Sequence, residues 1–311
     1  MDLAERVLAG DARAIARAIS VVEREDAGSA ALVGRLFGRT GRALAVGLTG
    51  APGVGKSTLV DRLTAALRRE RLRVGILAVD PTSPFSGGAI LGDRIRMQGH
   101  AADGGVFVRS MATRGQLGGL ARATDDARIV LDAAGIDVVL IETVGVGQGE
   151  IDVSRIADVS VVVLAPGGGD DVQAIKAGIM EIADVFVVNK ADRDGADRAV
   201  AEIEGMLSLR EPGTNRWRPP VVKTCAATGE GVDDAIGAVR RFADRGLAAG
   251  DRARRRARAR LEAILVGRIV ARIGAERDLD DAVDAIAARE IDPYAAAGDL
   301  VRRFVQEEPD S

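Results

Sequence analysis

The sequence predicts a doubly wound α/β fold, in which helices cover both faces of a mostly parallel sheet. Short β-branched runs alternate with helical stretches from residue 43 to about 228. Most of these runs are continuously apolar, as expected for strands that are buried on both faces of a parallel sheet. One run leads into a glycine-rich loop and then a helical pattern, an order typical of α/β sheets that bind a ligand where their strands end.

Seven apolar runs are predicted as the strands of this sheet, within a main domain that spans 43–246. They are Ala43–Leu48, Val74–Val79, Gly105–Val108, Val138–Ile141, Val159–Leu164, Val185–Val188 and Val221–Thr224. The carboxyl ends of parallel strands meet at one edge of a sheet, and ligands bind outside that edge. We therefore expect the functional residues to follow the strand ends.

The first 42 residues are expected to form a helical extension that caps the main domain. Apolar residues from Leu3 to Val22 recur at roughly helical spacing, with Arg and Glu between them. The pattern breaks at 26–29, and a further helix is predicted from Ser29 to about Phe37.

The C-terminal region, 247–311, differs in character from the rest of the chain. A dense arginine run at 251–260 precedes apolar residues at helical spacing, which predicts one long amphipathic helix. A shorter helical pair follows, and Asp292 is predicted to N-cap the last helix with Pro293 at its first position. The arginines could bind nucleic acid, but an acidic chain without interleaved aromatics favours a solvated face or the rim of a helix-mediated dimer.

Composition excludes several classes of protein. The 311 residues carry a net charge of −3, so no basic field calls for nucleic acid or an anionic membrane. One Cys and one His rule out an internal disulfide and a Cys/His zinc site. Because the N-terminus lacks an apolar signal core and no apolar run has the length of a membrane span, we expect a soluble, cytoplasmic protein with no membrane partner.

The glycine-rich loop carries the pattern Gly50-x4-Gly55-Lys56-Ser57 between a predicted strand and a predicted helix. Such a loop points backbone N–H groups at a phosphate chain, and the helix N-terminus adds partial positive charge. The lysine reaches the β- and γ-phosphates and the serine hydroxyl can ligate Mg²⁺. The loop is therefore predicted to bind nucleotide through Gly50, Ala51, Pro52, Gly53, Val54, Gly55, Lys56, Ser57 and Thr58.

A second segment indicates that the base is guanine. Asn189-Lys190-Ala-Asp192 follows a predicted strand, and the Asp192 carboxylate can accept from both the ring N–H and the exocyclic amine of guanine. Lys190 can cover the base face while Asn189 ties the segment to neighbouring backbone. The same residues could simply cap a helix, but their position downstream of the phosphate loop favours base recognition. After the last strand, Cys225, Ala226 and Ala227 form a loop in which the Ala226 N–H is expected to read the guanine oxygen.

Acidic residues at or after strand ends are candidates for a magnesium site, because Mg²⁺ prefers oxygen ligands. With Ser57 they are Asp80, Asp93 and Glu142, and each could instead be a helix cap or a solvated acid. Glu142 with Gly145 occupies the place where most GTPases sense the γ-phosphate with Asp-x-x-Gly.

Taken together, these segments resemble the MeaB/ArgK family of methylmalonyl-CoA mutase-associated GTPases. The matching segments are Thr49–Thr58, Val79–Ser83, Gly92–Met97, Arg109–Gly115, Glu142–Gln148, Gly167–Asp171 with Gln173 and Lys176, Asn189–Asp192 and Asp292–Tyr294. The usual Gln-Ser-Glu is Gln148-Gly-Glu150 here, and the usual Thr-Ser-Ala is Thr224-Cys-Ala226. Neither departure removes a charged group.

The resemblance implies slow GTP hydrolysis to GDP by a homodimer held by its C-terminal helices. It also implies a chaperone that gates adenosylcobalamin delivery to methylmalonyl-CoA mutase, or to a related acyl-CoA mutase, and protects the mutase from inactivation. The resemblance further implies that the residues contacting phosphate and magnesium are Lys56, Asp80, Asp93 and Glu142. We expect Lys56 and Glu142 to be catalytic.

Lys176 is a further catalytic candidate. It ends an acidic, glycine-led segment that begins at Asp170, and partner binding could bring it towards the phosphates as a cationic finger. Two other functions stay open from the sequence. A small-molecule kinase of the same fold would phosphorylate an acceptor, and a GTP-locked scaffold would bind a mutase without needing hydrolysis.

Overall fold

The computed structural model describes residues 1–80, 100, 103–112, 119–143, 149–167, 180–209, 217–245, 250–274 and 278–306. The chain forms two compact units, Met1–Ala253 and Arg254–Ser311. No helix within these described ranges is long and apolar enough to cross a membrane.

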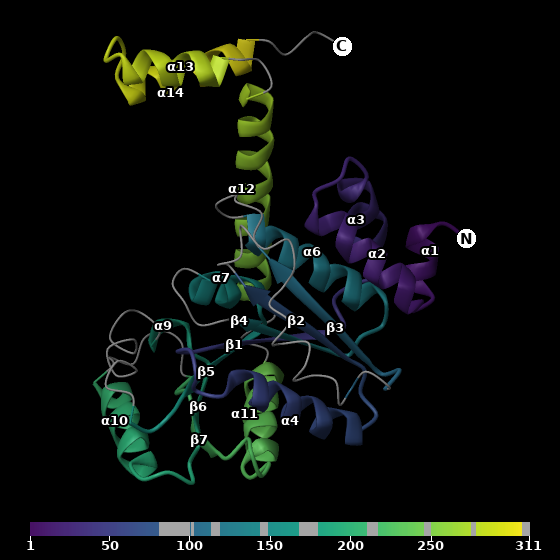
Figure 1. The fold of residues 1–311 in the computed structure, drawn as a ribbon, viewed down its shortest axis with the longest axis vertical. Helices are drawn as coiled ribbons and strands as arrows, with labels where there is room; N and C mark the ends of the chain where they lie inside the picture. Colours follow the sequence, from purple (N-terminus) through teal and green to yellow (C-terminus); the bar gives the residue numbers. More distant parts are fainter. Residues whose placement is uncertain are drawn as a thin grey trace. The chain divides into compact units, whose positions relative to one another are not determined.

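The first unit is built on a seven-stranded sheet in the order β3-β2-β4-β1-β5-β6-β7 (Figure 1). The strands are β1 (Leu44–Thr49), β2 (Val74–Asp80), β3 (Val106–Ala112), β4 (Val138–Thr143), β5 (Val159–Leu164), β6 (Val185–Asn189) and β7 (Val221–Thr224). Every ladder is parallel, which confirms the predicted fold class and all seven predicted strands. The central strand β1 lies between β4 and β5, and the strand order reverses there.

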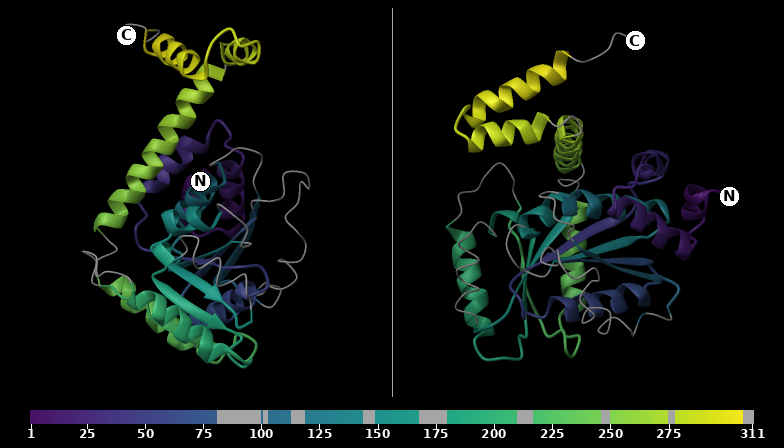
Figure 2. Two further views of the ribbon diagram at one scale, coloured as in Figure 1. Left: turned by 90° about the vertical axis from the view of Figure 1, so that its left-hand side faces the viewer. Right: turned by 45° about the horizontal axis from the view of Figure 1, so that its top comes forward.

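Helices cover both faces of the sheet because successive strand residues point to opposite sides. The helices of this unit are α1 (Leu3–Leu8), α2 (Ala12–Glu23), α3 (Ser29–Phe37), α4 (Lys56–Arg69), α6 (Gly119–Ala133), α7 (Gly149–Ile156), α9 (Met180–Ile182), α10 (Ala196–Ser208) and α11 (Val232–Asp244). On one face α4 and α11 pack on alternate residues such as Val46 and Ile76. On the other face, α6 and α7 pack on Ala45 and Leu77, and α10 packs over β5 and β6 (Figures 1 and 2).

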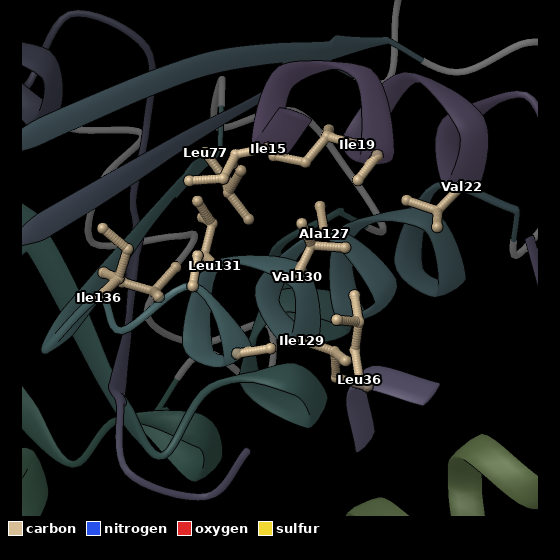
Figure 3. Packing of buried hydrophobic residues seen from close by; sticks show 14 of the residues in the cluster. Ile15, Ile19, Val22, Leu36, Leu77, Ala127, Ile129, Val130, Leu131 and Ile136 are labelled. Atoms are coloured by element: carbon tan, nitrogen blue, oxygen red, sulfur yellow. The ribbon is translucent and has the colours of Figure 1, made fainter. Parts of the chain in front are cut away.

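The N-terminal helices pack on the outer side of α6. Ile15, Ile19 and Val22 from α2 meet Ala127 and Val130 from α6 in one apolar cluster (Figure 3). An ion pair also joins α2 to β3, because Arg109 Nη2 lies 2.5 Å from Glu23 Oε2 at the end of α2.

The structure divides the first predicted helical stretch into α1 and α2. Gly10 has φ +75°, which interrupts the helix, and the Asp11 side chain starts the next one by accepting from the N–H groups of Arg13 and Ala14. The apolar spacing alone missed this break, because the hydrophobic face continues across it.

Buried and half-buried carboxylates hold the amino ends of β1 and β5. Asp132 accepts from the N–H groups of 41–43 just before β1, at 2.6–3.2 Å. Asp158 accepts from Ala45 N–H at 2.9 Å, and Asp184 accepts from Ser160 N–H at 2.8 Å. This amino rim, defined by Asp132, Asp158 and Asp184, is opposite the edge where the predicted site residues lie.

The second unit contains α12 (Gly250–Gly274) from Arg254 onwards, α13 (Asp278–Ala287) and α14 (Pro293–Gln306). The Asp292 side chain accepts from the N–H groups of Tyr294 and Ala295, which confirms the predicted N-cap and places Pro293 first in α14. Several large apolar side chains are exposed in this unit: Leu261, Leu265, Val266, Val270, Leu279, Val283, Tyr294 and Val301.

Candidate nucleotide-binding site

A cavity of about 430 Å³ opens at the carboxyl edge of the sheet, where the strand order reverses beside β1. This is the position at which open α/β sheets bind ligands. Its lining comes from the phosphate loop, the ends of β2 and β4, and the segment after β6. The lining residues are Pro52, Gly53, Gly55, Lys56, Ser57, Thr58, Ala78, Val79, Glu142, Thr143 and Lys190.

The loop that links β1 to α4 has no room for a side chain at two of its glycines. Gly50 has φ +143°, and a Cβ there would lie 2.0 Å from the Val163 carbonyl oxygen of β5. Gly55 has φ +95°, and its Cβ would lie 2.4 Å from Asn189 Nδ2. The loop is therefore packed tightly against the ends of β5 and β6, with the N-terminus of α4 facing the cavity.

Lys56 is the first residue of α4 and is almost fully buried. Its ammonium donates to the carbonyl oxygens of Gly50 and Ala51 at 2.7 and 2.9 Å, so it lies across its own loop. A phosphate oxygen in the cavity could replace these acceptors and gain the full charge of the ammonium.

Ser57 and Glu142 come together although they are far apart in the sequence. The Ser57 hydroxyl donates to Glu142 Oε1 at 2.5 Å, and Glu142 is 6% exposed at the end of β4. Register explains the contact, because Glu142 pairs with Leu48 of β1, just before the phosphate loop. A hydroxyl beside a carboxylate in a cavity supplies the hard oxygen ligands that Mg²⁺ requires, so these residues fit that ion.

The side chains of three predicted site residues lie outside the part of the chain that the structure describes. Asp80 ends β2, which lies between β3 and β4, but its side chain is not described. Asp93 and Lys176 lie wholly outside the described residues.

Asn189 joins the phosphate loop to the loop that follows β7. Its Nδ2 donates to the Val54 carbonyl at 2.9 Å. Its Oδ1 accepts from the Thr224 hydroxyl at 3.1 Å and from Ala226 N–H at 3.0 Å. The Ala226 N–H, which the sequence led us to assign to the guanine oxygen, is therefore donated to Asn189 in this structure.

Lys190 and Asp192 follow Asn189 in a turn. Lys190 has φ +58°, unusual for a residue with a side chain, and its ammonium donates to the Gly53 carbonyl at 2.6 Å. Its aliphatic stem thus extends towards the phosphate loop. Asp192 is exposed, and Ala191 N–H donates to the Thr224 carbonyl at 3.0 Å, which ties this turn to the end of β7.

Arg62 of α4 is a contact that sequence reasoning missed. Its Nε donates to the Ala226 carbonyl at 2.9 Å, and one terminal nitrogen donates to the Ala227 carbonyl at 2.7 Å. Nothing in the local pattern indicates this contact, since Arg62 reads as an ordinary charged position on an amphipathic helix. Only the packing of α4 beside the loop after β7 reveals it.

Comparisons with known proteins agree with this geometry. A family model described as methylmalonyl Co-A mutase-associated GTPase MeaB matches residues 15–277. A Pyrococcus abyssi protein named as a GTPase is 47% identical over 315 residues, which cover 98% of this chain and 96% of that protein. GTPase ArgK of Escherichia coli is 38% identical over 252 residues, or 79% of this chain and 76% of ArgK.

Two further similarities extend the comparison. The mitochondrial methylmalonic aciduria type A homolog of Mus musculus is 42% identical over 214 residues, which cover 68% of this chain and 52% of the mouse protein. Among solved structures, the LAO/AO transport system kinase matches with a TM-score of 0.69 and 28% identity, covering 98% of this chain and 96% of that one.

The parallel sheet, its phosphate loop and the names of these relatives define the class: this is a P-loop GTPase, a hydrolase that acts on GTP. The chain belongs to the MeaB family, whose model matches most of its length. The resemblance inferred from the sequence motifs is thereby confirmed.

Proposed function

We propose that this GTPase uses GTP hydrolysis to gate adenosylcobalamin loading of methylmalonyl-CoA mutase and to protect or reactivate that mutase. The observation that carries the proposal is the family match over 15–277, whose description names the mutase. The similarity to the mouse methylmalonic aciduria type A homolog supports the same partner. A related acyl-CoA mutase would be served by the same mechanism.

The reaction is transfer of the γ-phosphoryl group of GTP to water, in which positioning and charge neutralisation do most of the work. Lys56 and the N-terminus of α4 face the cavity and would neutralise the phosphate oxygens. Ser57 and Glu142 would hold Mg²⁺, which supplies further positive charge to the phosphates when bound.

Guanine selection falls to the segment after β6. Asn189 holds that segment against both the phosphate loop and the loop after β7, so base and phosphate contacts are made by one connected unit. Asp192 would accept from the two N–H groups of guanine that adenine cannot offer together. A site of this kind rejects the wrong base strongly, because the carboxylate would be left unpaired.

The second unit is proposed to form a homodimer. Its exposed apolar residues include Leu261, Leu265, Val266 and Val270 along α12, each at least half exposed. Exposed apolar side chains gathered along one helix are typical of an interaction site, and a second copy of the same helix would cover them.

Residues whose side chains the structure does not describe complete the proposal. Asp93, and Asp80 at the end of β2, are expected to join the magnesium site in one nucleotide state. Lys176 is expected to act as a cation that the partner brings to the phosphates. If Lys176→Ala left mutase-stimulated turnover at the wild-type rate, that role would be excluded.

The proposal is tested by measuring phosphate release from GTP with Mg²⁺, alone and with adenosylcobalamin-dependent methylmalonyl-CoA mutase. We expect slow turnover of GTP that rises when the mutase is added, with no turnover of ATP. Lys56→Ala serves as a control in two ways. Any phosphate released by this variant measures contaminating hydrolases. If the variant still restores mutase activity in a rescue assay, the protein acts as a scaffold that does not need hydrolysis. Turnover indifferent to every acyl-CoA mutase would overturn the partner and leave the GTPase.

A further inference from the structure

We propose that Arg62 is a positioning residue that aims the Ala227 N–H at the guanine O6 atom and so sets selectivity at that atom. The inference rests on the proposed use of guanine nucleotides and deepens it. Arg62 lies about a turn and a half beyond Lys56 on α4, so one helix would serve both the phosphates and the base.

The Arg62 guanidinium donates to two consecutive carbonyl groups at once. Arg62 Nε donates to Ala226 O at 2.9 Å and a terminal nitrogen donates to Ala227 O at 2.7 Å. The planar guanidinium presents its N–H groups in a fixed geometry, which two neighbouring acceptors match and a single ammonium cannot. Ala226 is 3% exposed, so its peptide lies where hydrogen bonds must be made within the protein.

Because the peptide group between Ala226 and Ala227 is planar, fixing the Ala226 carbonyl also fixes the direction of the Ala227 N–H group. No peptide bond in the described chain is cis, so each carbonyl points opposite to the N–H group of the next residue. Holding the Ala226 carbonyl towards α4 therefore turns the Ala227 N–H away from α4. Neither packing nor burial of the Ala227 side chain could set this direction, because that residue is exposed.

The neighbouring N–H groups are already used. Ala226 N–H donates to Asn189 Oδ1 at 3.0 Å, and Thr228 N–H donates to the Cys225 carbonyl at 3.1 Å. Between them, the Ala227 N–H has no acceptor among the residues that the structure describes. It is the donor of this loop that remains for a ligand, which moves the expected O6 contact from Ala226 to Ala227.

Binding measurements with three diphosphates test the role of Arg62. 6-Thio-GDP replaces O6 with sulfur, a larger and weaker acceptor, and keeps both groups that Asp192 would read. IDP keeps O6 and lacks the exocyclic amine. We expect Arg62→Ala to weaken GDP binding about three- to tenfold. We also expect it to shrink the preference for GDP over 6-thio-GDP and to leave the preference for GDP over IDP unchanged.

Two further variants sharpen the test. Arg69→Ala removes an exposed arginine from the same helix, one that pairs with Asp233 of α11 at 3.0 Å, and should bind all three nucleotides like wild type. Arg62→Lys can reach one carbonyl and should recover part of the 6-thio-GDP discrimination. Melting temperatures identify a variant that fails to fold.

Distinct outcomes separate the two proposals. Equal weakening for all three nucleotides, or an unchanged GDP to 6-thio-GDP ratio in Arg62→Ala, would overturn the positioning role while the guanine site stands. Failure of the wild-type protein to bind GDP would overturn the guanine site, and the role of Arg62 with it.

Discussion

The hydrogen bond between Ser57 and Glu142 is the residue-scale contact on which the magnesium site depends. It joins the start of α4 to the end of β4 at 2.5 Å, with Glu142 buried. A cation bound in the cavity would stabilise this carboxylate, because burial of a charged group is costly unless charge or hydrogen bonds compensate.

Glu142→Gln tests that function with little change in shape. The amide keeps an oxygen that can accept from Ser57 but carries no charge, so we expect GTP turnover to fall about 100-fold or more. The Mg²⁺ concentration for half-maximal turnover should rise as well. Turnover measured across a Mg²⁺ titration checks this, and an unchanged titration curve would remove Glu142 from the metal site.

Two glycines of the phosphate loop offer a matched pair of substitutions. An added Cβ at Gly55 would lie 2.4 Å from Asn189 Nδ2, whereas at Gly53, with φ +83°, it would meet nothing within 4 Å. We expect Gly53→Ala to lower the free energy of unfolding by about 1–2 kcal/mol through backbone strain alone. Gly55→Ala should weaken GDP binding much further, because it also displaces Asn189. Equal GDP dissociation constants for the two variants would contradict this.

At the scale of elements, a carboxylate ties α6 to the segment that leads from α3 into β1. Asp132 at the end of α6 accepts from three consecutive N–H groups between α3 and β1 and is 1% exposed. Asp132→Ala removes the acceptor of all three donors and leaves the N–H group of buried Ala43 unpaired, so we expect the free energy of unfolding to fall by about 1–3 kcal/mol. Urea denaturation measures this, and the GDP affinity of the folded fraction should stay unchanged.

The contact between α4 and the segment before β3 makes stability depend on pH. Hydrogen bonds from Arg68 and from Gly105 N–H lower the pKa of Asp103 below its ordinary 3.8. A carboxyl with a lowered folded pKa stabilises fully above its unfolded value, and this stabilisation is lost as the pH falls through the folded value. Asp103→Asn should thus be less stable than wild type at pH 7, and the difference should narrow below pH 3.8.

The control for this prediction is Asp233→Asn. The Asp233 carboxylate pairs with Arg69 on an exposed surface, where ion pairs contribute little. Unfolding curves from pH 7 to 3 should therefore differ little between this variant and wild type. A stability gap for Asp103→Asn that stays constant over the whole range would show that Asp103 acts through shape rather than charge.

The elements show how far the sequence predicts this structure. Strands buried on both faces leave continuous apolar runs, so all seven were found, and Asp292-Pro293 identified the start of α14. The phosphate loop was also predicted from the sequence, because binding phosphate requires glycine at fixed spacing. Arg62 and Asp132 were missed, since their partners lie 164 and 89–91 residues away and depend on how helices pack.

On the scale of the whole molecule, the two compact units divide the expected activities. The cavity lies in Met1–Ala253, and the apolar surface of α12 lies in Arg254–Ser311. Leu265→Glu would place a charge on that surface, so we expect it to convert a dimer to monomers and leave intrinsic GTP turnover unchanged. Leu209→Glu, at an exposed leucine of the first unit, is the control. Light scattering reports the mass, and a wild-type monomer would contradict the proposed dimer.

The amino rim has a consequence for how this protein can change over time. Asp132, Asp158 and Asp184 secure strand starts at the end of the sheet remote from the nucleotide cavity. Substitutions at that rim alter how much of the protein is folded, whereas substitutions at the cavity alter what the folded protein does. Thermal stability and nucleotide binding can therefore change independently. Evolution or engineering could improve one of these properties and leave the other as it is.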